Sequence, residues 1–266
     1  MVVAIAPLDI VEGQPEINLN KVESYLRHVR EDADIFVLPE LFSTGFPKDE
    51  AVMQLIAEPQ EGLTISRLKE LAYSRSIAIA GTYLCRDDRD GTLKNRAFFI
   101  NPDDDCNVTA YDKRHLFTIS PEHKLLKPGM SKLPVTGFRG WNIALAICFD
   151  IRFPVWCRNV GNEYDMMIVP ANWPDSRYSA WKHLLIARAI ENVAPYVGCN
   201  RSGIDLFGTY SYLSSFAVDH RGNIVSEIHG NSPVRHASFS LESLRDFRRK
   251  FPVHHSADKF TIDDIV

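Results

Sequence analysis

Short apolar runs alternate with helical hydrophobic patterns along almost the whole chain, and this alternation limits the fold more than any other feature. The run at residues 35–38 is wholly apolar, which is typical of a strand buried on both faces. Alternating strands and helices bury their apolar faces as sheets covered by helices, so the sequence predicts an α/β fold with two packed sheets. Strands are expected at residues 2–8, 35–38, 77–83, 97–100, 109–111, 141–147, 166–169, 196–200, 215–218, 224–227 and 236–239, and helices around 19–29 and 68–72, at 176–192 and at 241–250.

The chain has 266 residues, a length that fits one large α/β domain as well as two small ones. No internal repeat or Gly/Ser-rich linker divides it, so we interpret residues 1–266 as a single domain. The mixed polar and apolar segment at residues 258–266 is expected to be a C-terminal tail that lies on this domain or on a partner subunit.

The charge and composition argue against several classes of partner. The net charge is −4 and no Lys/Arg run is present, so nucleic acid and anionic membranes are poor candidates. The first residues do not form the basic segment of a signal peptide, and no run approaches the roughly 20 apolar residues of a membrane span. The five cysteines have no CxxC spacing, so we expect a reduced, cytoplasmic protein without a disulfide framework.

Three chemically useful side chains, Glu40, Lys113 and Cys148, follow predicted strands. Ligands of α/β proteins collect at such strand ends, because the rigid sheet directs the following loops toward one another. Each residue also has a structural interpretation. Glu40 and Lys113 could be solvated surface charges, and Cys148 could be an inert buried thiol.

Together, these three residue types supply the roles that hydrolysis of an amide by a thiol requires. Cys148 is the nucleophile, Glu40 is the base for its proton, and the Lys113 cation balances the developing oxyanion. Glu122, in the segment PEHKLLKPG, is a second acid that would hold the lysine or share the task of the base. The sequence contains no HExxH, GxGxxG or GxxxxGK motif, so we expect no metal and no organic cofactor.

Three motifs resemble those of the nitrilase superfamily of carbon–nitrogen hydrolases, and they occur in that family's order. They are PELFSTGF with Glu40, DKRHLF with Lys113 and ICFDIRFP with Cys148. The resemblance extends from the first strand to at least Gly222, and it implies a nitrilase-type four-layer α-β-β-α sandwich that commonly pairs through its helices as a homodimer. Shorter matches are Glu122 ahead of KPG, ANWP at residues 171–174 and ARAIEN at residues 187–192.

The resemblance also implies a mechanism. Glu40 would take the proton of Cys148, and the thiolate would attack the amide carbonyl. Lys113 and the backbone N–H of Phe149 would stabilise the oxyanion, and a water activated by Glu40 would cleave the resulting thioester. The nearby ammonium is expected to lower the pKa of the Cys148 thiol.

Within the superfamily, the sequence most resembles the omega-amidase branch, whose members release ammonia from the distal amide of α-ketoglutaramate or α-ketosuccinamate. These substrates carry a carboxylate, which a guanidinium binds well. Arg152 and Arg201 are candidates for this contact, although an ion pair with a neighbouring aspartate is the simpler interpretation of each. Trp173 would limit substrate length or pack in the core, and Asn172 would orient the amide. The family's Gly-x-Ser element has no glycine in residues 210–215, so no role carries over from that stretch.

Other functions remain open on the sequence. A nitrile hydrolase or an N-carbamoyl-amino-acid amidohydrolase would use the same three residues. A Cys–His hydrolase would pair Cys148 with His115, His123 or His183. A binding protein of another class would keep the fold without catalysis.

Overall fold

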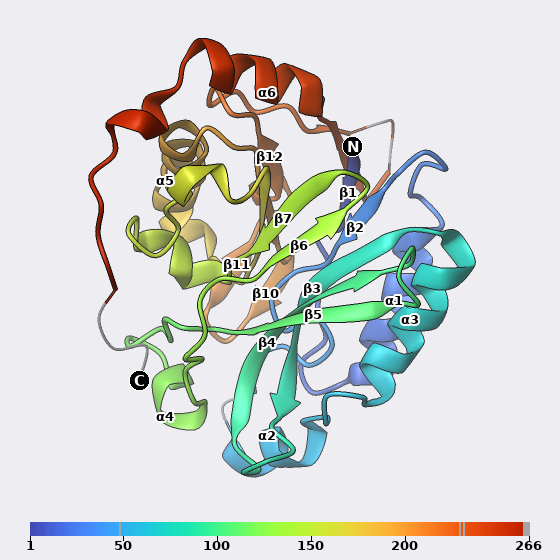
Figure 1. Ribbon diagram of the computed structural model, residues 1–266. Helices are drawn as coiled ribbons and strands as arrows, with labels where there is room; N and C mark the ends of the chain where they lie inside the picture. Colours follow the sequence, from blue (N-terminus) through green and yellow to red (C-terminus); the bar gives the residue numbers. More distant parts are fainter. Residues whose placement is uncertain (48, 229, 231, 263–266) are drawn as a thin grey trace.

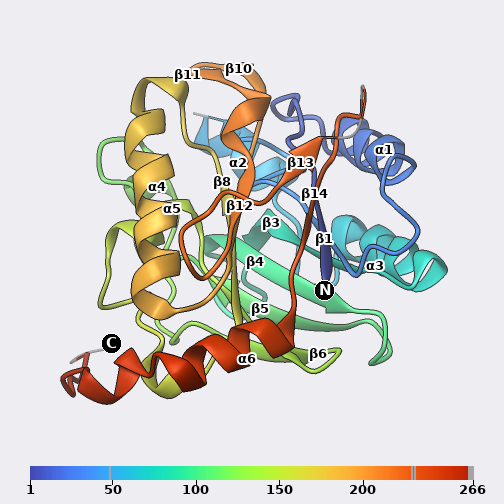
Figure 2. The ribbon, with the colours of Figure 1, turned by 90° about the horizontal axis from the view of Figure 1, so that it is seen from above.

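The computed structural model describes residues 1–262 except residues 48, 229 and 231. In this part of the chain, two large sheets pack face to face and helices cover their outer faces (Figure 1). Figure 2 shows α5 (Tyr178–Asn192) on one side of the sheets, with α1 (Pro15–Leu26) and α3 (Leu63–Arg75) on the other. The four layers form the α-β-β-α sandwich that the family resemblance implies.

The larger sheet has seven described strands in the order β13-β14-β1-β2-β3-β4-β5, and its three central strands β1, β2 and β3 run parallel. The strand β5 is antiparallel to β4, which is antiparallel to β3, so β5 runs in the same direction as β2. The bounds are β1 (Val2–Ile5), β2 (Ile35–Val37), β3 (Ala78–Arg86), β4 (Leu93–Asn101), β5 (Asn107–Asp112), β13 (Glu227–Ile228) and β14 (Arg235–Ser238).

The second sheet has five described strands in the order β12-β9-β8-β7-β6, and β7, β8 and β9 run parallel. A separate hairpin is formed by β10 and β11. Because parallel strands end at the same edge of a sheet, the loops after β2 and β5 gather at one edge, and those after β7 and β8 at another. The bounds are β6 (Val135–Phe138), β7 (Trp141–Leu145), β8 (Met166–Ala171), β9 (Tyr196–Asn200), β10 (Gly203–Asp205), β11 (Gly208–Tyr210) and β12 (Phe216–Val218).

The apolar strands are buried on both faces, as residues 35–38 predict. Ile35 and Val37 belong to the core between the two sheets, whereas Phe36 and Leu38 pack under α1 and α3. Successive side chains of a strand point to opposite faces, so one short apolar run serves two layers of the core.

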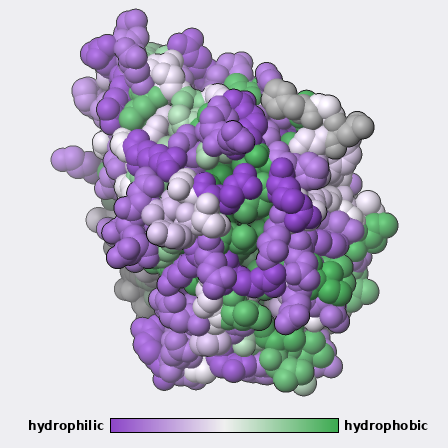
Figure 3. All heavy atoms as spheres, turned by 90° about the vertical axis from the view of Figure 1, so that its right-hand side faces the viewer, coloured by the Kyte–Doolittle hydropathy of each residue, from purple (hydrophilic) through white to green (hydrophobic). Residues whose placement is uncertain are grey.

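The helices bury one face and expose the other. Leu19, Val22 and Leu26 of α1 pack on the larger sheet, and Trp181 and Leu185 of α5 pack on the second. Figure 3 shows the side of the molecule where α1 and α3 lie in Figure 1, and hydrophilic residues predominate there with separate hydrophobic patches. Among the described residues, none of the helices combines the length and the apolar content that crossing a membrane requires.

Several predicted bounds are wrong. The strand β7 ends at Leu145 rather than at residue 147, and β13 covers Glu227–Ile228 rather than residues 224–227. The predicted helix at 176–192 starts as a 3-10 turn, η3 (Asp175–Arg177), before α5. The predicted tail at 258–266 is described only to residue 262, and residues 263–266 lie outside the described part.

Some elements were missed by the sequence patterns. The helix α2 (Glu50–Ile56) buries only Met53, so its apolar period is too weak to detect, although Asp49 caps its first N–H groups. The helix α4 (Glu122–Leu125) was missed because it is a single turn. In contrast, α6 (Leu241–Lys250) matches its predicted range. The strands β6, β10 and β11 were also missed, because few of their residues are buried and they carry little apolar alternation.

Candidate active site

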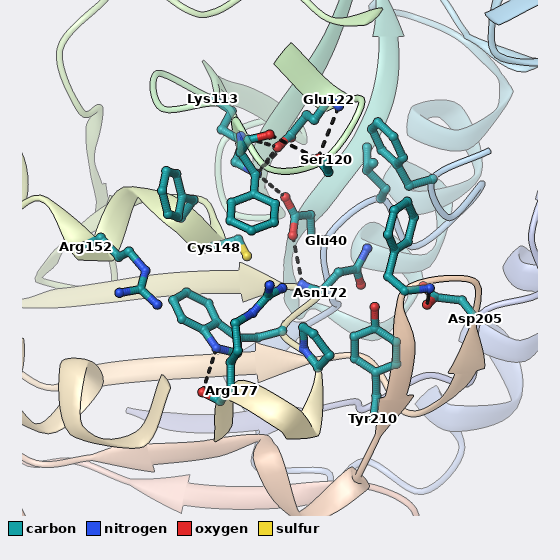
Figure 4. Close-up of a pocket in the computed structure, with 17 residues that line it drawn as sticks. Glu40, Lys113, Ser120, Glu122, Cys148, Arg152, Asn172, Arg177, Asp205 and Tyr210 are labelled. Carbon is teal, nitrogen blue, oxygen red and sulfur yellow. Dashed lines mark hydrogen bonds and ion pairs between the residues drawn. The ribbon is translucent and has the colours of Figure 1, made fainter. Parts of the chain in front are cut away.

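The structure brings Glu40, Lys113 and Cys148 together in one pocket. Glu40 follows β2, Lys113 follows β5, and Cys148 follows β7 at the start of the 3-10 turn η1 (Cys148–Arg152). Their exposed fractions are 4%, 2% and 8%, so neither charged side chain is a solvated surface group. Strand ends from both sheets therefore deliver an acid, an ammonium and a thiol to the same cavity (Figure 4).

Lys113 lies between two carboxylates. Its Nζ is 2.7 Å from Oε1 of Glu40, and 2.8 and 3.0 Å from the two oxygens of Glu122. Asn95 Nδ2 donates to Glu40 Oε1 at 2.8 Å, and the backbone N–H of Asn172 donates to Glu40 Oε2 at 2.8 Å. The Glu40 carboxylate is thus held by donors from three segments, with its position fixed relative to the lysine.

The charges of this cluster decide the protonation state of the lysine. Burial by itself lowers the pKa of Lys113, but Glu122 and Glu40 outweigh it and raise that pKa well above its ordinary value of 10.5. Lys113 is therefore an ammonium at neutral pH, as a cation that balances an oxyanion must be. Glu122 also accepts the backbone N–H of Phe117 at 2.7 Å, so both of its oxygens are occupied.

The Cys148 thiol differs from the sequence-based expectation. Burial raises its pKa well above its ordinary value of 9.0, the Glu40 carboxylate raises it further, and Lys113 and the Asn172 N–H lower it without compensating. The predicted lowering by the ammonium is therefore wrong in its net direction, because it ignored burial and the facing carboxylate. The resting thiol is neutral and needs a base to become a nucleophile.

The backbone at Cys148 is strained. Its φ is +43°, in the left-handed region that non-glycine residues rarely occupy. The buried Asp150 stabilises this sharp turn, since its carboxylate accepts from the backbone N–H of Ile147 at 2.9 Å and from the Tyr111 hydroxyl at 2.9 Å. The turn aims the thiol into the pocket at the end of β7. Apart from its place in the ICFDIRFP motif, Asp150 carries no sequence signal of this structural role.

The histidine alternatives find no support in this geometry. The His115 ring lies 2.8 Å from Asp150 Oδ1 and stacks on Phe153, while His123 and His183 contact backbone oxygens of their own segments. No histidine is among the described residues that line the pocket. Within the described part of the chain, no group of three or more His, Cys, Asp or Glu side chains is arranged to hold a metal ion.

All four predicted substrate-binding residues line the same pocket, and Arg201 does not. Arg201 forms a buried ion pair with Asp205 at 2.8 Å, so its structural interpretation is the correct one. Arg152 does not pair with Asp150, and its guanidinium lies over the rings of Trp173 and Phe149. The pocket is lined by Glu40, Leu41, Phe46, Lys113, Phe117, Ser120, Glu122, Cys148, Phe149, Arg152, Asn172, Trp173, Pro174, Arg177, Asp205, Phe207 and Tyr210.

Sequence reasoning missed Asn95, Arg177 and Tyr210. Asn95 lies in the interior of β4, where a single polar residue gives no signal of a role at the site. Arg177 follows the ANWP segment by three residues and ends η3 directly before α5, so its position next to a motif was the only available indication. Tyr210 ends β11, a strand that the pattern did not reveal.

Replacing Glu40 with glutamine is expected to lower the pKa of the Cys148 thiol while it reduces turnover by about 10²- to 10⁴-fold. The carboxylate charge raises the pKa of the Cys148 thiol, so its removal lowers that pKa, even though the predicted base is lost. Thiolate absorbance across a pH series measures the shift, with a Cys148→Ala protein as the blank. A thiol that titrates at the same or higher pH in the variant would contradict this electrostatic assignment.

Comparisons with known proteins agree with this site and fold. Residues 2–249 match the family model of carbon–nitrogen hydrolases. The omega-amidase YafV of Yersinia enterocolitica is 37% identical over 248 residues, which cover 93% of each chain. The 2-oxoglutaramate amidase of Bacillus subtilis is 31% identical over 92% of this chain and 93% of its own. A carbon–nitrogen hydrolase superfamily structure from Xanthomonas campestris has a TM-score of 0.89 at 29% identity, with 98% of both chains covered.

The chain belongs to the carbon–nitrogen hydrolase family, and it is a hydrolase that acts on carbon–nitrogen bonds. Within the nitrilase superfamily, its relatives place it in the omega-amidase-like branch. Both findings confirm the resemblance that the three motifs indicate.

Proposed function

We propose that this protein hydrolyses the distal amide of small α-keto acid amides, such as α-ketoglutaramate and α-ketosuccinamate, to the dicarboxylate and ammonia. The observation that carries the proposal is the 2.7 Å contact of Lys113 with Glu40 in the pocket that also contains Cys148. The names of the omega-amidase and 2-oxoglutaramate amidase relatives support this substrate class.

In the first half of the reaction, Glu40 takes the proton of the neutral Cys148 thiol as the sulfur attacks the amide carbonyl. A base is required because the pKa of the thiol is raised. The Lys113 ammonium and the backbone N–H of Phe149 stabilise the oxyanion of the tetrahedral intermediate. Glu40 then gives its proton to the leaving nitrogen, ammonia departs, and a thioester on Cys148 remains.

In the second half, Glu40 takes a proton from water, and the resulting hydroxide attacks the thioester carbonyl. The tetrahedral intermediate collapses with release of the acid, and the Cys148 sulfur recovers its proton. Glu122 binds Lys113 with both oxygens and accepts the Phe117 N–H, so we assign it a positioning role. Of the two tasks that the sequence left open for Glu122, this geometry favours holding the lysine.

The rest of the pocket supports recognition of a small polar substrate. Arg152 reaches the pocket over Trp173, where its guanidinium can bind the substrate carboxylate. Trp173 is buried, and its Nε1 donates to the Arg177 carbonyl, which makes it a rigid wall that limits substrate length. Asn172 Oδ1 is a buried acceptor without a partner among the described residues, and it is available to the substrate amide.

A substrate panel tests the proposal directly. We expect kcat/KM for α-ketoglutaramate to exceed that for N-carbamoyl amino acids, simple nitriles and an unrelated aliphatic amide by about 100-fold or more. Ammonia release and loss of substrate are measured side by side with the same enzyme preparation. Faster turnover of a nitrile or of a carbamoyl compound would assign the site to one of those reactions. No turnover of any amide would favour a binding protein.

We also propose that the enzyme is a cytoplasmic homodimer with a single catalytic domain. The five cysteines are all free thiols, which suits a reducing compartment. Pairing through helices is supported by Ile190 on α5 and by Phe251 just after α6, whose side chains are 51% and 56% exposed. Sedimentation velocity over a range of protein concentrations tests the pairing, and a monomer throughout would contradict it.

A further inference from the structure

Two arginines line the active-site pocket, and neither forms an ion pair with a carboxylate in the described part of the chain. They are Arg152 and Arg177, whose guanidinium groups lie over aromatic rings. The other charged side chains that line the pocket all form ion pairs. Lys113 pairs with Glu40 and Glu122, and Asp205 pairs with Arg201. A guanidinium that faces a pocket without a carboxylate partner is available to an anionic ligand.

The charge balance of the pocket also favours an anionic ligand. With its acids ionised, Lys113 balances one of its two carboxylate partners, and the Arg201–Asp205 pair is neutral. Arg152 and Arg177 then leave the pocket with one uncompensated positive charge. A substrate that carries a single carboxylate would neutralise it, whereas a neutral amide would leave it unbalanced.

The backbone of Arg177 is fixed in place. Its N–H donates to the Pro174 carbonyl at 2.9 Å, and its carbonyl accepts from Trp173 Nε1 at 2.9 Å. The neighbouring Asp175 accepts the backbone N–H of Ser211 at 2.9 Å, which ties the turn to the segment after β11. The base of the side chain is therefore held by the same indole that walls the pocket.

The guanidinium of Arg177 is also oriented. It lies 4.8 Å from the ring centroid of Phe117, in a cation–π contact that leaves the edge of the guanidinium free to donate. Figure 4 shows Arg177 extending into the pocket from η3, while Arg152 enters from a different direction. Arg177 immediately precedes α5, and the positive end of that helix dipole adds to the attraction for an anion.

We propose that Arg177 is a specificity-determining residue that binds the carboxylate end of the substrate together with Arg152. The inference rests on the proposed amidase function and names the residue that selects its monoanionic substrates over neutral amides. Hydrolysis converts the neutral amide into a second carboxylate next to Glu40 and Glu122. The dianionic product then exceeds the positive charge of the pocket, and repulsion by the two glutamates promotes its release.

The experiment compares Arg177→Met with wild type on α-ketoglutaramate and on the neutral amide pentanamide. We expect KM for α-ketoglutaramate to rise about 10- to 100-fold with kcat little changed, and both constants for pentanamide to stay as they are. Arg177→Lys should recover part of the affinity, since it restores the charge without the planar fork. Arg221→Met is the matched control, because Arg221 stacks on Phe247 at 4.7 Å and does not line the pocket.

Binding measurements on a variant that cannot cleave the substrate test this inference independently of the proposed function. Calorimetry with Cys148→Ala and with Cys148→Ala/Arg177→Met measures the affinity for α-ketoglutaramate without turnover. Loss of affinity in the double variant supports the role of Arg177, even if wild type proves inactive on this amide and the proposed reaction fails. Equal affinity of the two proteins, or equal losses on α-ketoglutaramate and pentanamide, would overturn the assignment of Arg177.

Discussion

Replacing Lys113 with methionine is expected to abolish amide hydrolysis and to lower the free energy of unfolding by about 3–5 kcal/mol. The change removes the cation that we propose balances the oxyanion. It also leaves the buried carboxylates of Glu40 and Glu122, both within 2.8 Å of the ammonium, facing each other without a counter-charge. Turnover of α-ketoglutaramate and urea unfolding monitored by fluorescence measure the two effects.

Two further variants isolate the cause. Lys69→Met removes a lysine whose ammonium lies 2.8 Å from Glu61 at the surface, and it should cost less than about 1 kcal/mol. Adding Glu122→Gln to Lys113→Met should recover part of the stability, because it removes one of the uncompensated charges, but none of the activity. Activity of Lys113→Met within tenfold of wild type would exclude Lys113 from the oxyanion site.

The same ion cluster has a defined pH dependence. The pKa of Lys113 in the folded protein is raised above its ordinary value of 10.5, so folding favours the protonated form. This stabilisation is fully present below that ordinary value and is lost as the pH rises through the higher pKa of the folded state. The stability difference between wild type and Lys113→Met should therefore persist through neutral and mildly alkaline pH, and narrow only in strong alkali.

The sequence predicted the layers of the fold well because the buried strands carry uninterrupted apolar runs. Ile35 and Val37 face one layer and Phe36 faces the other, so the run had to be apolar throughout. Elements that bury little were missed, as α2 illustrates with its one buried residue, Met53. Hydrophobic periodicity arises from burial, so it does not identify an element that lies mostly in solvent.

For the site, the motifs indicated Glu40, Lys113 and Cys148 individually, but only the fold gives their surroundings. The direction of the Cys148 pKa shift was wrong because it depends on burial and on the facing Glu40, neither of which a linear motif specifies. Arg177 was missed for a similar reason. Its proposed role depends on the lack of an ion pair between its guanidinium and any carboxylate of the described residues, and sequence spacing cannot reveal that.

Replacing Cys148 with alanine is expected to reduce turnover by about 10⁴-fold or more, with a change in unfolding free energy within about 1 kcal/mol. The side chain that is lost is small and faces the pocket, and alanine experiences the same left-handed strain at φ +43°. Cys85→Ala is the control, because Cys85 is a buried thiol on β3 that does not line the pocket. It should retain full activity.

The proposed thioester offers a direct test of the role of Cys148. Acid quenching during turnover of α-ketoglutaramate should trap an acyl adduct, detected by mass spectrometry on the peptide that contains residue 148. The adduct should form in Cys85→Ala and be absent from Cys148→Ala. An adduct on another cysteine would assign the nucleophile to that residue instead. Turnover by Cys148→Ala without any adduct would mean that the raised pKa of the Cys148 thiol marks an inert buried group. Glu40 and Lys113 would then act on water directly, and the strained turn at Cys148 would have no catalytic purpose.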